Sequence, residues 1–415
     1  MWKPWSHRPA LWTVASGIAT FLAFSQLFTL TLIFSSLWLS RCGGQAGPSS
    51  LMASAALILL PRLAGSVIWG DRADRYGPLT ALRTCLAFSA ATSAVVSLVA
   101  VRPPGTPGGT GIYGALVGLS AFTAGGMWPI SAVLCASSAS AQRRGRAGLS
   151  PQLGVLAAVI TAACFGLLVF RSPPLVSVNA WIATSHAALA VAMFGVRRTA
   201  GQAQRMRQST TRADPMESRP HRATLHISRR SWRRLLLAGA ALSTTFAVFG
   251  MATAPVVGID ARADQLEDPR VAAALATSIC ALVVAGTIAA IVSDALPRQL
   301  IVLVGTSLTA GAALCAALLK PDASPVTVAL LAIPAALPFG CGAALLPALF
   351  PPDHRAVSVG IASALGAAGG AVASAVATAA PSSGPGGAPS PVVVAVVGTF
   401  SALCIVAVIR DTARE

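Results

Sequence analysis

The chain has 415 residues, of which 55% are hydrophobic and 10% are charged. Soluble domains carry about 25% charged residues, so this chain has too few charges to cover a surface in water, and we exclude an ordinary soluble protein. The net charge of +17 would suggest nucleic-acid binding in a soluble protein. Cytoplasmic loops of membrane proteins also retain Arg and Lys, so we expect a membrane protein that binds no nucleic acid.

Apolar segments recur along the whole chain, each about as long as the 20 or so residues that a helix needs to cross the hydrocarbon core. Backbone amides must be paired in lipid, so these segments must be helices. The pattern predicts an all-α membrane protein with twelve transmembrane helices. The expected segments are 11–39, 51–70, 79–101, 110–138, 148–170, 176–196, 235–259, 271–293, 299–319, 325–350, 356–380 and 390–409.

The distribution of Arg and Lys predicts the orientation in the membrane. With the N-terminus inside, the cytoplasmic segments hold 23 Arg and Lys residues and the outer loops hold six. Positively charged loops stay on the cytoplasmic side. We therefore predict a multi-pass protein of the plasma membrane whose N- and C-termini are both cytoplasmic.

The longest polar stretch, Arg197–Arg234, divides the segments into two sets of six and contains eleven arginines. Its composition is typical of a cytoplasmic linker that does not form a packed domain. The predicted organisation is a six-helix bundle at 1–196, the basic linker at 197–234 and a second six-helix bundle at 235–415. The linker is interpreted as a solvated basic segment, with binding of anionic lipids as the alternative.

A short acidic and basic turn follows the second segment of each set. In the first set, Gly70 allows close helix approach, Asp74 is placed to face the positive end of a neighbouring helix and nearby arginines, and Gly77 suits a sharp turn. We interpret the turns as conformational latches that hold the cytoplasmic side closed, the alternative being plain basic loops. The latch candidates are Gly70, Asp74, Arg75, Gly77, Asp294, Arg298 and Arg355.

The pattern Gly70-x-x-x-Asp74-Arg75-x-Gly77 resembles the signature loop of the major facilitator superfamily. A narrower resemblance is to the metabolite:proton symporter family, which includes shikimate, citrate and proline/betaine carriers. It rests on Gly125–Trp128, Arg143–Arg146, Ser150–Gly154, Arg62, Phe350-Pro351, Arg355 and Gly360. The resemblance implies two six-helix bundles around a central pathway, alternating access and uptake by proton symport.

Two segments depart from the family's pattern. Phe21–Phe24 stands where the family has an acidic, aromatic stretch, and Val117 and Gly125–Met127 stand where it has an arginine and a Gly-Gly-Glu. No carboxylate remains deep in any expected span, which argues against proton coupling because intramembrane ionisable residues usually carry such functions. Facilitated diffusion and export therefore remain alternatives to symport.

A modest polar set inside the expected spans supplies the substrate-pathway candidates. Arg62 either faces the pathway or extends to an interface, and His186 either titrates or packs. Trp128 either lines the cavity or belongs to a helix interface, and Gln152 follows Pro151, where a kink would expose backbone carbonyls. The candidates are Gln26, Thr29, Arg62, Trp128, Gln152, Asn179 and His186.

Enzyme chemistry is not expected, because the sequence has no nucleophile–base set, no phosphate-binding loop and no metal-ligand spacing. The missing phosphate loop also argues against an ATP-driven pump. We predict a monomeric transporter, with no cofactor and no metal, that moves a small polar or amphipathic metabolite. The alternatives are an efflux carrier of the same fold and a non-transporting sensor or degenerate paralogue.

Overall fold

The computed structural model describes residues 9–41, 48–100, 109–171, 229–257, 268–319, 325–379 and 391–412. The regular structure in these residues is entirely helical. Two short 3-10 helices, η1 (Ala141–Arg143) and η4 (Pro352–His354), precede long helices. The long helices are α1 (Pro9–Arg41), α2 (Pro48–Tyr76), α3 (Pro78–Ala100), α4 (Gly109–Ser138), α5 (Arg144–Arg171), α7 (Arg229–Val257), α9 (Pro269–Val292), α10 (Arg298–Leu319), α11 (Pro325–Leu349), α12 (Arg355–Ala379) and α13 (Pro391–Thr412).

Ten of the helical segments in the described residues are long and apolar enough to cross a membrane. Helix α2 is not among these ten, although it is 29 residues long, and it contains the charged Arg62. The chain is therefore a multi-pass, all-α membrane protein, as its composition predicts.

The helices coincide with the expected segments wherever both can be compared. The expected segment 176–196 lies outside the described residues, so the count of twelve stays a prediction. One boundary was wrong: α7 begins at Arg229, so residues 229–234 belong to a helix and not to the linker. The reason is that Arg234 is buried against α13, and hydropathy alone does not register a charged helical turn.

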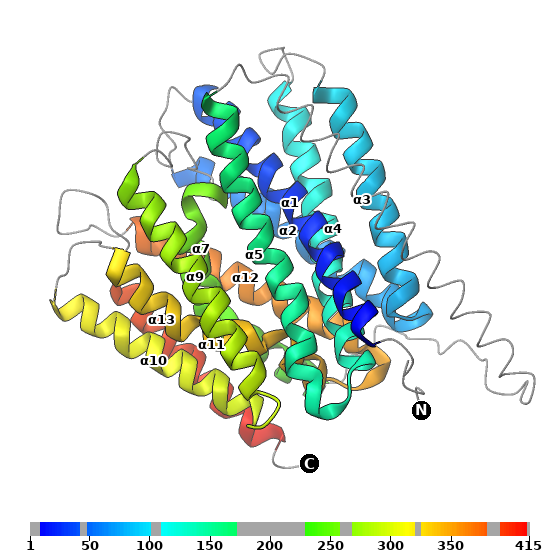
Figure 1. Cartoon of the computed structure of the whole chain (residues 1–415), viewed down its shortest axis with the longest axis vertical. Coiled ribbons are helices and arrows are strands. Elements are labelled where there is room, and N and C mark those ends of the chain that lie inside the picture. The colour runs from blue at the N-terminus through cyan, green and yellow to red at the C-terminus, as the bar shows by residue number, and fades with distance from the viewer. Residues whose placement is uncertain are drawn as a thin grey trace, which may run out of the picture.

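Helices α1, α4 and α5 pack together, and α2 packs on α4; farther along the chain, α7 packs on α12, α9 on α11 and α10 on α13. Several contacts join these groups, and the most extensive are those of α2 with α12 and of α5 with α11. Figure 1 places α3 at one edge of the molecule and α10 and α13 at the opposite edge. Helices α2, α5, α11 and α12 therefore form the junction at which the site lies.

Small residues allow this close packing. The backbone of Gly125 in α4 lies against the backbone of Arg62 in α2, so a side chain at Gly125 would overlap it. The Ser66 hydroxyl, one turn along α2, donates to the Gly125 carbonyl at 2.9 Å. Such small-residue crossings are how helices associate in lipid, where burial of apolar surface gives little driving force.

Candidate functional site

Asp74 contacts the start of α12. This contact lies at the end of the molecule where α2 and α4 end and where α5 and α12 begin. Asp74 Oδ1 accepts the backbone N–H of Ala356 at 2.8 Å, and Oδ2 accepts that of Val357 at 3.0 Å. The first N–H groups of a helix have no partner within it, and the positive end of the helix dipole favours an anion there. Asp74 thus lies at a positive helix end, where the sequence pattern placed it. This end is called the basic end below, after Arg72, Arg75, Arg144, Arg298 and Arg355.

Two glycines make the Asp74 contact geometrically accessible. Gly77 has a φ of 88°, a left-handed conformation that residues with a Cβ rarely adopt, and it turns the chain from α2 into α3. A Cβ on Gly70 would lie 2.7 Å from the Cα of Val357, closer than packed carbon atoms approach. The two helix backbones therefore meet at Gly70, and Asp74, one turn farther along, reaches the end of α12.

The second acidic turn makes an equivalent contact with α5. Asp294 follows α9, and its Oδ1 accepts the backbone N–H of Gly145, in the first turn of α5, at 2.7 Å. Arg146 Nε lies 3.2 Å from Asp294 Oδ2, within ion-pair range, although the N–H is not aligned for a hydrogen bond. The two contacts join α2 to α12 and α9 to α5 at one end of the molecule.

The latch arginines do not bond to the two carboxylates. Arg75 Nε pairs with Asp71 at 2.9 Å, one turn back on α2, and Arg355 Nε donates to the carbonyl of Phe350 at 3.2 Å. Arg298 acts on Asp294 only through the electrostatic field. Backbone amides, and not guanidinium groups, are therefore the direct partners of Asp74.

Asp74 lies outside the expected span 51–70, and its environment favours the protonated form. Burial raises the pKa of the Asp74 carboxyl to about 7, because desolvation penalises the charge. The bonds from Val357 and Ala356 lower this pKa in part. Of the nearby charges, Asp71 raises the pKa of Asp74, and Arg355 lowers it by a smaller amount. Asp74 can therefore exchange a proton near neutral pH.

Deeper in the molecule, Gln152 of α5 links three helices. Trp128 Nε1 of α4 donates to Gln152 Oε1 at 3.0 Å, and Gln152 Nε2 donates to the backbone carbonyl of Phe339 in α11 at 2.6 Å. The Phe339 ring stacks on Phe249 of α7, with the ring centroids 5.9 Å apart. Both Trp128 and Gln152 are buried. The two pathway candidates thus belong to one polar junction across α4, α5 and α11.

Arg62 lies between two aromatic rings. Its guanidinium carbon is 5.6 Å from the ring centre of Phe24 in α1 and 5.9 Å from that of Phe246 in α7. Arg62 precedes the end of α2 at Tyr76 by fourteen residues, which corresponds to about 21 Å along a helix. It therefore lies at the middle of α2, and the aromatic faces stabilise its charge there.

Two further pathway candidates, Gln26 and Thr29, lie in α1 and form no hydrogen bond to this junction among the described residues. Gln26 accepts from the hydroxyl of Ser89 in α3 at 3.1 Å, and its Nε2 is buried with no partner in the described part of the chain. Thr29 is buried, and its hydroxyl likewise has no partner among these residues. Asn179 and His186 lie outside the described residues.

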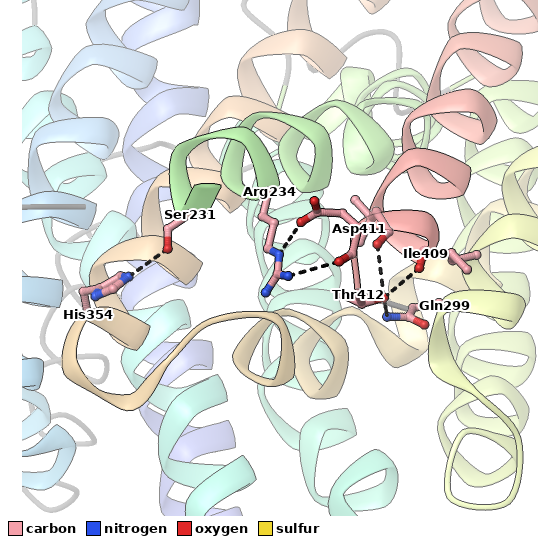
Figure 2. A network of polar contacts seen from close by, with 8 residues as sticks. Ser231, Arg234, Gln299, His354, Ile409, Asp411 and Thr412 are labelled. Carbon is pink, nitrogen blue, oxygen red and sulfur yellow. Dashed lines mark hydrogen bonds and ion pairs between the residues drawn. The ribbon is translucent and has the colours of Figure 1, made fainter. Parts of the chain in front are cut away.

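Sequence reasoning missed the aromatic partners of Arg62 and a polar network at the basic end of α7. Figure 2 shows this network, in which Arg234 Nε pairs with Asp411 Oδ2 at 2.5 Å and Nη2 donates to the Asp411 carbonyl at 3.3 Å. His354 Nε2 lies 3.3 Å from the Ser231 hydroxyl. The signal for the aromatic partners was present, because a lone mid-span arginine requires either a counter-charge or aromatic faces.

A scan of the chain against protein-family models and a search of curated proteins both find no match.

Proposed function

We propose that the chain is a secondary transporter of the major facilitator type, which moves a small polar or amphipathic metabolite across the plasma membrane by alternating access. The observation that carries this proposal is the pair of contacts at the basic end, Asp74 with α12 and Asp294 with α5. Each joins helices that precede the 172–228 stretch to helices that follow it. Equivalent parts in two halves around a central site are typical of secondary transporters.

The two contacts act as latches in this proposal. Both are polar contacts at a helix end, where water can replace a broken hydrogen bond, so each can open without leaving an unpaired group in lipid. The Gln152 bond to Phe339 crosses the same junction farther inside. Opening the basic end breaks all three together, and it exposes Arg62 and its aromatic neighbours to the side from which the latches withdraw.

Arg62 is the residue that we propose contacts substrate. Among the described residues no carboxylate pairs with it, and its partners there are the rings of Phe24 and Phe246. A guanidinium stays charged in proteins and binds carboxylates in a bidentate manner. The substrate class that fits best is a small molecule with a carboxylate and an apolar part that contacts the rings.

The proposed coupling follows from where the carboxylates lie. The described carboxylates are at or beyond helix ends: Asp71, Asp74, Asp268, Asp294, Asp353 and Asp411. We propose that transport depends weakly or not at all on an imposed proton gradient, in contrast to the symport that the family resemblance implies. Protonation of Asp74 is distinct from proton coupling. It shifts the equilibrium between the closed and open contact but does not carry a proton across the membrane.

Uptake into proteoliposomes tests the function. Purified chain is reconstituted, and a panel of labelled monocarboxylates, dicarboxylates and betaines is screened with and without a pH gradient. We expect saturable uptake of at least one carboxylate, loss of that uptake in Arg62→Gln, and little effect of the gradient. Binding of a carboxylate without any flux would instead indicate a sensor, and outward transport from loaded vesicles alone would indicate an efflux carrier.

Reporter fusions test the orientation. Fusions at Gln208 and at the C-terminus should report the cytoplasm, and a fusion at Gly384 should report the outside. An external signal at Gln208 would reverse the proposed orientation and place the latches on the outer face.

A further inference from the structure

A cavity of about 440 Å³ lies beside the basic end, apart from the junction described above. It is lined by six residues of α2 together with Phe88 of α3 and Phe122 of α4. The α2 residues are Ile68, Trp69, Asp71, Arg72, Arg75 and Tyr76. Ile68 and Tyr76 are exposed, so the cavity opens on the outer surface of these helices and not toward the substrate junction.

The cavity has an apolar floor. The rings of Trp69, Phe88 and Phe122 pack against one another with centroid separations of 5.6 to 5.8 Å. Trp69 precedes Tyr76 by seven residues, which is about 10 Å along a helix. The aromatic floor therefore lies on the membrane side of the rim, at a depth where an acyl chain is the natural neighbour.

The rim of the cavity carries two arginines and one acid. Arg75 pairs through Nε with Asp71 at 2.9 Å, and Arg72 donates through Nε to the hydroxyl of Thr84 at 3.1 Å. The Arg72 guanidinium also lies 5.5 Å from the ring centre of Tyr76. The rim is therefore net positive, and no hydrogen bond or ion pair among the described residues uses the Nη groups of either arginine.

Trp69 contributes its ring to this floor and not its N–H group. The residue is 8% exposed, and its indole Nε1 is fully buried. A Cβ on Gly126 of α4 would overlap the Cδ1 of Trp69, so the edge of the ring beside the N–H faces α4 and not the cavity.

We propose that this cavity binds one anionic phospholipid of the surrounding bilayer. The phosphate is held by Arg72 and Arg75, and the acyl chain lies on Trp69, Phe88 and Phe122. The lining is mainly apolar, which favours an amphiphile over a free anion, and its two arginines favour a negative headgroup over a zwitterionic one. The site is distinct from the basic linker, for which lipid binding is the alternative to a solvated segment.

The lipid would act on the same turn that bears the Asp74 contact. Asp74 lies between Arg72 and Arg75 on α2, so a headgroup bound to both arginines fixes the helix end that presents Asp74 to α12. The proposal does not depend on transport, because lipid binding is measured on the purified chain.

Native mass spectrometry of the full chain, released from detergent micelles, measures the binding directly. The chain is titrated with dioleoylphosphatidylglycerol and, separately, with dioleoylphosphatidylcholine. We expect the first phosphatidylglycerol to bind at least about fivefold tighter than phosphatidylcholine, since an arginine near a membrane surface contributes about that factor. Equal affinity for the two lipids would overturn the proposal. Displacement of phosphatidylglycerol by millimolar inorganic phosphate would also overturn it, because the site would then be one for a free anion.

Matched variants locate the site. The pair Arg72→Gln and Arg75→Gln should weaken phosphatidylglycerol binding about tenfold or more. The control pair Arg83→Gln and Arg233→Gln removes the same charge outside the cavity and should change affinity less than about twofold. An equal loss in the control pair would mean that net charge, and not this cavity, attracts the lipid, and the proposal would be wrong.

Discussion

At α12 the carboxylate of Asp74 accepts two backbone N–H groups, whereas at α5 the carboxylate of Asp294 accepts one and lies beside Arg146. The glycine that permits the approach also differs. Gly70 belongs to the helix that carries the aspartate, and Gly145 belongs to the helix that receives it. The two regions therefore use the same contact, a carboxylate on backbone amides beside a glycine, but place the glycine on different helices. A comparison of the two turns in the sequence identifies the aspartate but not the backbone amide that it contacts.

This difference predicts that the two contacts respond to different perturbations. The Asp74 contact uses both carboxylate oxygens on backbone N–H groups, whereas the Asp294 contact uses one oxygen in this way and has the exposed Arg146 beside the other. Amide hydrogen exchange on the reconstituted chain reports both, because the N–H groups of Gly145, Ala356 and Val357 are the donors.

The largest effect is expected from Gly145→Ala. A Cβ there would overlap the Ser293 hydroxyl and the Ala290 carbonyl, and relieving such an overlap costs about 1–3 kcal/mol. Exchange in the first turn of α5 should rise roughly tenfold to a hundredfold, while the first turn of α12 changes little. Gly111→Ala is the control, because nothing lies within 4 Å of a Cβ at Gly111. Unchanged exchange in Gly145→Ala would show that α5 is not held by this approach.

The next largest effect is expected from Asp74→Asn. The amide keeps one acceptor oxygen and loses the other, so one of the two α12 N–H groups loses its partner, at a cost of about 1–2 kcal/mol. Exchange at the start of α12 should rise about tenfold, and uptake should fall at normal expression. Asp71→Asn is the control on the same helix, because Asp71 pairs with Arg75 and not with α12. Full uptake with unchanged exchange in Asp74→Asn would contradict the latch.

A smaller effect is expected from pH at Asp74. Its pKa is about 7 in the closed contact, against about 3.9 for an exposed Asp, so closing takes up a proton between these values. The contact is therefore stabilised as pH falls through 7, by about eightfold from about pH 7.5 to about pH 6. Protection factors for α12, corrected for intrinsic exchange, should follow this change, and Asp74→Asn should abolish it. A contact that weakens on acidification would reverse the sign of the argument.

The smallest effect is expected from Arg146→Gln. Arg146 is 61% exposed and is not aligned for a hydrogen bond, and such surface pairs contribute about 0–1 kcal/mol. Exchange at the start of α5 should change by less than about fivefold. A loss as large as that of Gly145→Ala would mean that the Asp294 contact depends on charge and not on backbone approach.

Much of the fold follows from the sequence, because the length and hydropathy of a membrane helix are local properties. The predicted start of α7 is too late because Arg234 resembles a linker residue when only its sequence neighbours are considered. Its partner, Asp411, lies 177 positions farther along the chain. The Asp74 contact could be predicted because its turn has a distinctive spacing. The partner of Gln152 could not, because Phe339 contributes a backbone carbonyl, and every residue has one.

The hydrogen bond from Gln152 to the Phe339 carbonyl has a consequence for the rate of the proposed transport cycle. Both partners are neutral, and interhelical hydrogen bonds of this kind in membranes average about 0.6 kcal/mol. A bond of that strength lengthens the lifetime of the closed state less than about threefold. An ion pair at the same depth would lengthen the lifetime of the closed state much more, since separating two charges in lipid is far more costly. In the proposed transport cycle, the amide at position 152 therefore lets the junction keep its register while it opens and closes.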